Sequence, residues 1–500
     1  MMADEQGVRD EPDEQVVRDL RYAELKAHDP RFDGRFFVGV TSTGIYCRPV
    51  CKAKLPAKRN CRFFKTAAEA EQAGFRPCLL CRPDIAPGLS PMEAGADLAR
   101  RSAQMLQDEC ASIGGLDSVA ARLGYTTRHL RRVFEEAYQV TPLQFLQTCR
   151  LLLAKSLLTD SDLTVGAVAR AAGFGSTRRF NQLFKEHYRL CPTKLRKQTA
   201  GITAEDGLIT LQLSYRPPYA WGALLDFFAG RAIAGVELVR DGAYFCTVRL
   251  ADKQGKPVCG WLRVRNLASK NRLAVSISES LLPVVSTVLA RIRRQFDLGS
   301  DPAQVAEQLQ VMDELRPGLC VAGTRVPGCF DAFQMCVRTV LGQQITVKAA
   351  GTLAARIAET YGTPIETGVE GLDRLFPSAG EVLTMGDAIE DNFGRLGVTS
   401  ARSRTIRALA EAVSTGEVDF AHPADPTLEM DKLCALKGIG PWSANYIAMR
   451  AMGYGDAFLE SDYGVKKALP GYGTPKARKA LAEAWHPWRS YAVMNLWNSL

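Results

Sequence analysis

The chain has 500 residues, of which 46% are hydrophobic and 23% are charged. At roughly 150 residues per domain this length predicts about three or more folded units, and the composition excludes a mainly disordered or fibrous chain. The longest apolar stretches are interrupted well short of the roughly 20 residues that a bilayer span requires, and the acidic N-terminus is unlike a signal peptide. We therefore expect a cytoplasmic protein without a membrane partner.

The net charge of +9 is distributed unevenly along the chain. Residues 34–87 hold 10 Lys and Arg against 3 Asp and Glu, and residues 88–200 hold 16 against 10, whereas the last 300 residues are nearly balanced. Residues 1–33 hold 10 acidic against 5 basic side chains and are expected to form a loose acidic leader. A concentrated basic excess is typical of contact with nucleic-acid phosphates, although a solvated surface also produces one.

Four of the 14 cysteines form two close pairs: three residues separate Cys47 from Cys51, and two separate Cys78 from Cys81. Two such pairs allow four thiolates to converge tetrahedrally on one Zn2+, and the alternative is two unrelated buried pairs. We predict a small zinc-binding α/β domain over residues 34–87. Eight basic residues flank the ligands and suit contact with phosphates: Arg48, Lys52, Lys54, Lys58, Arg59, Arg62, Arg76 and Arg82.

The segments "TSTGIYCRPVCKAK" and "AGFRPCLLCRPD" resemble the N-terminal domain of the Ada adaptive-response family, which repairs methylphosphotriesters in DNA. The resemblance implies that Cys47 is both a zinc ligand and the methyl acceptor, with Cys51, Cys78 and Cys81 as the other ligands. Zinc keeps the cysteine thiols ionised near neutral pH, so the coordinating sulfur atoms stay nucleophilic toward a methyl group. The alternative is a zinc finger with a purely structural role.

Residues 116–192 nearly repeat themselves, because "SVAARLGYTTRHLRRVFEEAYQVTP" aligns with "AVARAAGFGSTRRFNQLFKEHYRLCP" at an offset of 49, then 50, residues. Each copy predicts a short helix, a turn with glycine, and a second helix that begins after Thr127 or Ser176 as the N-cap. This is the layout of a helix-turn-helix, and two copies predict a tandem domain over residues 88–200. Leu151–Leu158 is expected to lie in the helix that links the copies.

The second helices carry polar side chains that suit base edges and phosphates, although solvated helix faces look the same. The module resembles the AraC-type regulators over about residues 95–197, which implies binding to promoter DNA, transcription activation and a contact with RNA polymerase. The DNA-binding side chains expected on this resemblance are Arg128, His129, Arg131 and Arg132 in the first copy and Arg178, Arg179, Asn181 and Gln182 in the second.

After residue 200 the apolar residues alternate, as in Ile209, Leu211 and Leu213, which predicts strands of an α+β domain over residues 203–315. The remainder, residues 316–500, is predicted to be all-α. Its periodic stretches are residues 331–360, 400–415, 441–452, 475–485 and 489–498.

The segment "LKGIGPWSANYIA", residues 436–448, predicts a hairpin followed by a helix. Gly438 and Gly440 permit a close backbone approach, and Pro441 opens a helix whose free amide groups suit a DNA phosphate. Asp462 follows after an intervening helix, and most of the six tryptophans lie in the last sixty residues.

These features resemble the helix-hairpin-helix DNA glycosylases of the AlkA, or 3-methyladenine DNA glycosylase II, family over about residues 208–500. The motifs are "YRPPYAW", "VPGCFDAF", "VLGQQIT", "KGIGPWSANY" and "HPWRSYAVMNLW". The resemblance implies that Asp462 is the catalytic carboxylate, that Gln343 contacts DNA, and that a monovalent cation binds hairpin carbonyls. Gln344 occupies the position of the family's apolar wedge. The expected walls of the base pocket are Trp442, Tyr446 and Trp497.

The chemistry of this site also follows from the residue types. A purine alkylated at N3 or N7 is cationic and leaves easily once it is flipped out of the stack, and aromatic walls favour a cation. A carboxylate stabilises the positive charge that develops on the sugar. The later hairpin positions carry Trp442 and Ser443 rather than an amine nucleophile, so we expect a monofunctional enzyme.

The sequence therefore predicts a multidomain, mainly α-helical DNA-alkylation response protein associated with the nucleoid. The alternative is a transcription regulator whose glycosylase-like part binds DNA but lacks activity. No histidine follows a cysteine, so the Pro-Cys-His-Arg motif of O6-methylguanine repair has no counterpart, and no cysteine lies beyond Cys434 to hold an iron-sulfur cluster.

Overall fold

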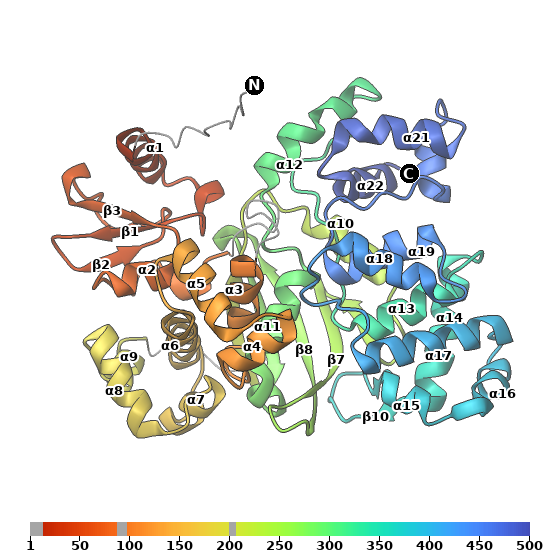
Figure 1. The fold of residues 1–500 in the computed structure, drawn as a ribbon, viewed down its shortest axis with the longest axis horizontal. Helices are drawn as coiled ribbons and strands as arrows, with labels where there is room; N and C mark the ends of the chain where they lie inside the picture. Colours follow the sequence, from red (N-terminus) through yellow and green to blue (C-terminus); the bar gives the residue numbers. More distant parts are fainter. Residues whose placement is uncertain (1–13, 88–97, 200–206) are drawn as a thin grey trace, which may run out of the picture.

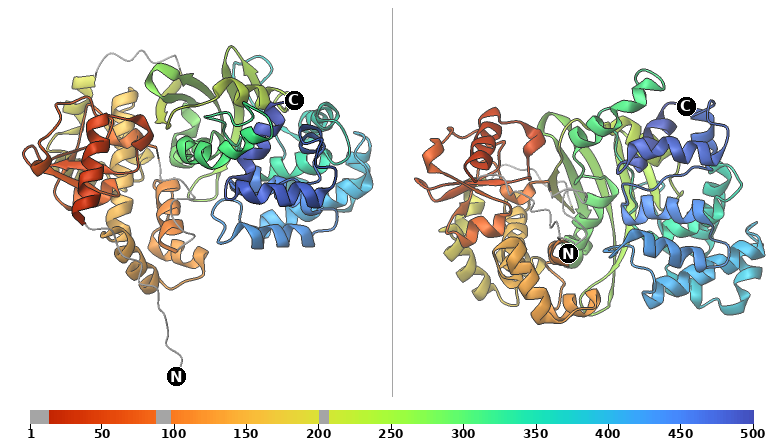
Figure 2. Two further views of the ribbon diagram at one scale, coloured as in Figure 1. Left: turned by 90° about the horizontal axis from the view of Figure 1, so that it is seen from above. Right: turned by 45° about the horizontal axis from the view of Figure 1, so that its top comes forward.

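The computed structural model describes residues 14–87, 98–199 and 207–500, and the chain folds into four consecutive units (Figure 1). The first unit, residues 14–87, is called the zinc-type module. It lies together with the helix-turn-helix unit, residues 98–199, on one side, and the C-terminal helices lie on the other, with the α+β unit between them (Figures 1 and 2). The multidomain, mainly helical fold predicted from the sequence is confirmed. The domain boundaries expected near residues 88, 200 and 203 lie outside the described residues.

The first unit is a four-stranded sheet with strand order β3-β1-β2-β4. Strand β1 pairs antiparallel with β2 and β3, and β2 pairs parallel with β4. This register places Cys47, at the end of β2, opposite Val38 in the buried centre of the module. The elements are α1 (Glu14–Ala27), β1 (Phe37–Val40), β2 (Ile45–Cys47), β3 (Cys61–Phe64), α2 (Ala67–Gln72) and β4 (Arg76–Pro77).

Helix α1 differs from the loose leader that we expected over residues 1–33. Its Leu25 is buried in the cluster that contains the four paired cysteines, and the hydroxyl group of Tyr22 donates a hydrogen bond to the Pro56 carbonyl (3.0 Å). Residues 14–27 are therefore a part of the zinc-type module, and the prediction of a loose leader is wrong for them. Residues 1–13 lie outside the described residues.

The second unit holds two helix-turn-helix motifs joined by a long central helix. Its elements are α3 (Leu98–Asp108), α4 (Leu116–Leu123), α5 (Thr127–Tyr138), α6 (Pro142–Asp160), α7 (Val165–Ala171), α8 (Thr177–Tyr188) and α9 (Pro192–Thr199). Helix α6 extends well beyond the expected Leu151–Leu158, because a capping box of Thr141 and Gln144 starts it earlier.

The N-caps of the second helices follow the prediction in one copy and differ by one residue in the other. Ser176 caps α8 by accepting a hydrogen bond from the Arg179 amide, as predicted. Helix α5 is capped by Thr126, which accepts from the His129 amide, so the prediction of Thr127 is wrong. Thr126 is also the true repeat partner of Ser176, at the offset of 50 residues.

The third unit is a five-stranded antiparallel sheet with strand order β5-β9-β8-β7-β6. Its elements are β5 (Leu208–Ser214), α10 (Trp221–Ala229), β6 (Glu237–Arg240), β7 (Ala243–Ala251), β8 (Pro257–Leu267), β9 (Arg272–Ser278) and α11 (Val285–Gln295). The alternating residues Ile209, Leu211 and Leu213 are all buried, in agreement with the pattern that predicted this strand.

The fourth unit is almost entirely helical. Its elements are α12 (Pro302–Leu309), α13 (Ala332–Leu341), α14 (Val347–Tyr361), α15 (Ala379–Leu383), α16 (Ile389–Gly394), α17 (Ser400–Thr415), α18 (Pro426–Ala435), α19 (Pro441–Ile447), a π-helical turn (Ala448–Met452), α20 (Tyr463–Ala468), α21 (Pro475–Ala482) and α22 (Arg489–Asn498). Two short strands, β10 (Thr363–Pro364) and β11 (Arg374–Leu375), interrupt the helices.

The helix expected over residues 331–360 is broken between Leu341 and Val347. Gln344 adopts a left-handed backbone conformation (φ 57°), and Thr346 caps the helix that follows. This short loop carries the two glutamines implied by the family resemblance. In the described part of the chain, every helix is too short or too polar to cross a membrane.

Candidate metal centre and candidate active site

The four paired cysteines converge on one point in the first unit. Their Sγ atoms all lie within 4.8 Å of one another, and all four residues are buried. Cys47 ends β2, Cys78 directly follows β4, and the backbone amide of Cys78 donates to the Tyr46 carbonyl (3.0 Å), so the sheet holds the two pairs together. Four thiolates at this separation fit the tetrahedral coordination of one Zn2+.

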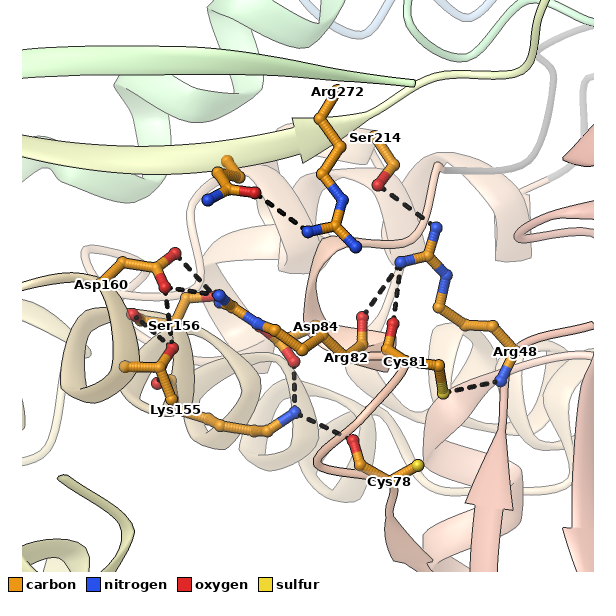
Figure 3. A network of polar contacts seen from close by, with 12 residues as sticks. Arg48, Cys78, Cys81, Arg82, Asp84, Lys155, Ser156, Asp160, Ser214 and Arg272 are labelled. Atoms are coloured by element: carbon orange, nitrogen blue, oxygen red, sulfur yellow. Dashed lines mark hydrogen bonds and ion pairs between the residues drawn. The ribbon is translucent and has the colours of Figure 1, made fainter. Parts of the chain in front are cut away.

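Arg48, the neighbour of Cys47, ties the cysteine cluster to the rest of the molecule. Its backbone amide donates to Cys81 Sγ (3.3 Å), and its buried guanidinium group donates to the Cys81 carbonyl (2.9 Å) and pairs with Asp33. Nη2, which pairs with Asp33, also donates to the hydroxyl group of Ser214 in β5 (3.2 Å), which belongs to the α+β unit (Figure 3). The candidate metal centre therefore lies against the α+β unit rather than at the end of an isolated module.

Asp84 is the centre of a second buried polar contact beside the cysteines (Figure 3). It forms ion pairs with Lys155 of α6 and with Arg82 (2.9 Å), and the hydroxyl group of Ser156 donates to it (2.8 Å). Burial by itself raises the pKa of Asp84, but the charges of Lys155 and Arg82 outweigh this effect and lower the pKa below its usual range. Arg82 also pairs with Asp160 at the end of α6.

These contacts change the interpretation of the eight basic residues around the cysteines. Arg48 and Arg82 are engaged in internal ion pairs, and Lys58 pairs with Asp19 of α1 (2.5 Å). Lys52, Lys54, Arg59 and Arg62 remain exposed. The sequence alone cannot show which of the eight basic residues pair with Asp33, Asp84 or Asp19 in the folded chain. The basic surface is therefore smaller than expected.

The polar residues expected to bind DNA lie on the second helix of each helix-turn-helix. All are exposed except His129, which is half-buried and stacks on Tyr125 with a ring separation of 5.4 Å. Arg132 pairs with Glu136 one turn later (2.8 Å). The opposite faces are fully buried through Phe134 and Phe184, so packing directs the polar faces outward. The exposed set is Arg128, Arg131, Arg132, Arg178, Arg179, Asn181 and Gln182.

Asp462 lies at the N-cap of α20 and is held by three hydrogen-bond donors. Its carboxylate accepts from the Val465 amide (3.0 Å), from Trp497 Nε1 (2.8 Å) and from Trp442 Nε1 (3.3 Å). The two indole groups come from α22 and α19, so three helices meet at this carboxylate. The structure brings together Asp462 and all three expected pocket aromatics.

A cavity of about 490 Å3 opens beside this carboxylate. Trp442 and Tyr446 stack along one wall with ring centroids 5.2 Å apart and planes 14° apart, and Trp497 meets Tyr446 edge to face at 6.2 Å. Phe227 of α10 stacks behind Trp497 at 6.2 Å. The cavity lies between the third and fourth units, and its size suits one nucleobase and its sugar.

Sequence reasoning missed Phe227, Arg231 and Arg450 near this cavity. Arg231 follows α10 and lines the cavity, whereas Arg450 lies beneath Tyr446 in the π-helical turn. No local motif marks these residues. They come together only because α10 of the α+β unit packs against the helical unit.

The glycine hairpin that precedes α19 is held by two side chains, those of Thr405 and Gln343. Gly438 has a left-handed conformation (φ 98°), and a Cβ atom there would lie 2.1 Å from the Thr405 hydroxyl oxygen. That hydroxyl group donates to the Lys437 carbonyl (2.9 Å). Gln343 Nε2 donates to the Gly438 carbonyl (2.9 Å) and to the Ser443 hydroxyl oxygen (3.1 Å).

Gln343, which the sequence assigned to DNA contact, is thus bound to the hairpin, and Arg402 donates to its carbonyl oxygen. Gln344 is exposed at the tip of the same loop. Gly440 is the N-cap of α19 with ordinary extended backbone angles, and nothing lies within 4 Å of a Cβ atom built there. Of the two hairpin glycines, only Gly438 is required by its conformation and its contacts.

A buried four-cysteine site, a tandem helix-turn-helix and an aspartate in an aromatic cavity after a glycine hairpin define a modular DNA-binding repair protein. Matches to three family models agree with this class. The metal binding domain of Ada matches residues 20–84, a helix-turn-helix domain matches residues 119–198, and the AlkA N-terminal domain matches residues 210–331. The first match begins within α1, in agreement with the packing of that helix.

A Mycobacterium tuberculosis protein named as a probable bifunctional transcriptional activator/DNA repair enzyme AlkA is 36% identical over 487 residues, which cover 96% of each chain. The chain therefore belongs to this family of bifunctional transcriptional activators and DNA repair enzymes. DNA-3-methyladenine glycosylase 2 of Escherichia coli is 35% identical over 57% of this chain and 95% of its own. The E. coli Ada protein is 30% identical over 31% of this chain and 43% of its own.

Proposed function

We propose that this chain repairs alkylated DNA by two separate reactions and regulates transcription in response to one of them. Asp462 carries the base-excision part of the proposal, because its carboxylate is held by two indole N–H groups at the wall of an aromatic cavity. The cysteine cluster carries the methyl-transfer part, and the two exposed polar helix faces carry the binding to operator DNA.

In the proposed excision reaction, an N3- or N7-alkylated purine is flipped out of the duplex and enters the cavity between Trp442, Tyr446 and Trp497. The N-glycosidic bond breaks, its electron pair leaves with the base, and positive charge develops on the sugar. Asp462 stabilises that charge and accepts a proton from the water that attacks C1′. The similarity to the E. coli enzyme named DNA-3-methyladenine glycosylase 2 supports this substrate class.

The cavity favours hydrolysis by water over a covalent amine intermediate. None of the described residues that line the cavity is a lysine, and an arginine stays protonated and is a poor nucleophile. We therefore infer a monofunctional glycosylase that releases the base and leaves the DNA strand intact. Gln344, exposed on the loop after α13, is the residue that we propose to occupy the gap left by the flipped nucleotide.

In the proposed methyl transfer, the Cys47 sulfur attacks the methyl carbon of a DNA methylphosphotriester. A C–S bond forms, the methyl C–O bond breaks, and the electron pair stays on the phosphate oxygen. Zn2+ held by Cys47, Cys51, Cys78 and Cys81 would keep these thiols ionised and nucleophilic. The thioether product is stable, so each protein accepts one methyl group.

Transcription regulation in this proposal follows the methyl transfer. Methylation removes one negative charge beside exposed Lys52 and Lys54, which should strengthen binding to DNA phosphates. We expect the bound protein to activate transcription through contact with RNA polymerase, and to act on the chromosome in the cytoplasm. We also expect the hairpin to bind one monovalent cation through backbone carbonyls, with Gly438 as a candidate ligand.

Release of free bases from alkylated duplex DNA tests the proposed excision. The intact chain should release 3-methyladenine and 7-methylguanine, and Asp462→Asn should bind the same DNA but release neither base. Equal release by both proteins removes Asp462 from the mechanism. Binding without release by the unaltered chain supports instead a regulator with an inactive glycosylase-like region.

A further inference from the structure

Two arginines without carboxylate partners meet at the hydroxyl end of Tyr446. Arg450 Nη1 donates to the phenol oxygen (2.8 Å), and Arg450 is itself held by the backbone carbonyls of Pro327 and Gly328. Arg231 lies 3.7 Å above the ring of Phe227 and lines the cavity. Neither arginine forms an ion pair in the described part of the chain, so their positive charges act on Tyr446 without neutralisation.

The position of Arg450 is fixed from several sides. Only 3% of it is exposed, and its guanidinium carbon lies 4.7 Å from the ring centre of Phe227 and 5.6 Å from that of Tyr446. The π-helical turn that carries it directly follows the helix of Tyr446. The hydrogen bond from Arg450 to the phenol oxygen is therefore built into the wall of the cavity before any base enters.

A phenol oxygen has two lone pairs and one hydrogen. Arg450 and Arg231 both donate toward the phenol oxygen, so the O–H bond must point away from both arginines. We propose that Arg450 fixes Tyr446 as a hydrogen-bond donor into the cavity, so that the enzyme selects flipped bases presenting a ring nitrogen or a carbonyl oxygen to it. This inference rests on the proposed base excision and adds a specificity determinant to it.

The charge around Tyr446 agrees with this role. Burial by itself raises the pKa of the phenol, but the charges of Arg450, Arg231 and Arg338 outweigh burial and lower it below the ordinary value of 10. Arg338 contributes less than Arg450 and Arg231, and it pairs with Glu237 (3.2 Å). A more acidic phenol is a stronger donor, and it loses its donor function at a lower pH than an ordinary tyrosine.

The test is a double-mutant cycle of Tyr446→Phe and Arg450→Met on duplex DNA carrying one 7-methylguanine. Tyr446→Phe keeps the ring and removes the donor, and it should lower kcat/KM about 10-fold or more, because an acceptor on the base is left unmatched. Arg450→Met should lower kcat/KM as well, and the double variant should be no worse than Tyr446→Phe alone, because Arg450 acts through Tyr446. Tyr361→Phe, in the helical core, is the matched control and should leave excision unchanged.

The pH profile separates positioning from a merely structural role. Excision by the unaltered protein should fall at alkaline pH as Tyr446 ionises. This fall should move to higher pH in Arg450→Met. In Arg450→Lys it should lie between the positions for the unaltered protein and for Arg450→Met. Tyr446→Phe should lack the fall. Unchanged kcat/KM in Tyr446→Phe, or multiplied effects in the double variant, overturns the inference. Asp462→Asn is measured in parallel: full excision by that variant overturns the proposed function itself, whatever Tyr446 does.

Discussion

Replacing Gly464 by alanine should damage the candidate active site far more than the fold. A Cβ atom at Gly464 would lie 2.8 Å from Trp497 Cδ1, 3.0 Å from Trp497 Nε1 and 3.1 Å from Asp462 Oδ1. The indole group must shift, and its 2.8 Å hydrogen bond to the carboxylate is then lost or lengthened. Hydrogen bonds to charged groups contribute about 1.5 to 3 kcal/mol, so we expect excision to fall roughly 10- to 100-fold.

The loss of stability should be partly offset, because Gly464 lies in helix α20 with ordinary backbone angles. Alanine in a helix is favoured over glycine by about 0.5 to 1 kcal/mol. The assay is base release from 7-methylguanine duplexes together with thermal unfolding. Gly351→Ala is the matched control, since Gly351 also lines the cavity from a helix and nothing lies within 4 Å of its Cβ position. Full excision by Gly464→Ala would refute the reasoning, as would equal losses in both variants.

Three further predictions concern the N-terminal units. Cys81→Ser should lower the zinc content of the purified full-length chain as measured by metal analysis, and unchanged zinc content would contradict the four-cysteine site. Asp84→Asn should destabilise the protein by about 3 to 5 kcal/mol, because it leaves the buried charge of Lys155 uncompensated and Arg82 paired with Asp160 alone. The pKa of Asp84 is lowered by those charges, so the contribution of Asp84 to stability is present above pH 4 and is lost as the pH falls through its lower pKa in the folded state. Chemical unfolding of both proteins at several pH values checks this. A stability difference between the unaltered protein and Asp84→Asn that does not change with pH argues against it. Methylation of Cys47 should strengthen operator binding about tenfold, and less so as salt rises. Binding titrations at two salt concentrations check this. Equal affinities of the methylated and unmethylated proteins would exclude regulation of DNA binding by the charge of the metal site.

The sequence predicts the ligands and the pocket residues well where the chemistry is carried by local motifs. Cys47 and Cys51, or Gly438 and Trp442, are close together in the chain, and their spacing reflects one short turn each. The zinc cluster is confirmed as a converging set. Asp462, Trp442, Tyr446 and Trp497 also meet as the resemblance implied, and their catalytic roles stay predictions.

The sequence fails where the outcome depends on packing between distant segments. The acidic composition of residues 1–33 does not predict helix α1. Contacts of Leu25 and Tyr22 with the zinc-type module stabilise this helix, rather than the helix propensity of its own residues. The sequence predicts that Arg48 and Arg82 contact DNA, whereas the structure pairs them with the buried carboxylates of Asp33 and Asp84. A tertiary contact likewise brings Arg231 to Tyr446 from more than two hundred residues away in the chain, whereas Arg450 lies only four residues from Tyr446.

The central claim is that one chain performs two independent repair reactions at two separate sites. It is tested most directly on a single alkylated duplex that contains both methylphosphotriesters and 7-methylguanine, with the intact chain, Cys47→Ser and Asp462→Asn assayed side by side. Mass spectrometry of the protein reports methyl transfer, and chromatography of the released bases reports excision. We predict that Cys47→Ser loses only methyl transfer and that Asp462→Asn loses only excision. Methyl transfer that persists in Cys47→Ser, or excision that persists in Asp462→Asn, would contradict the account.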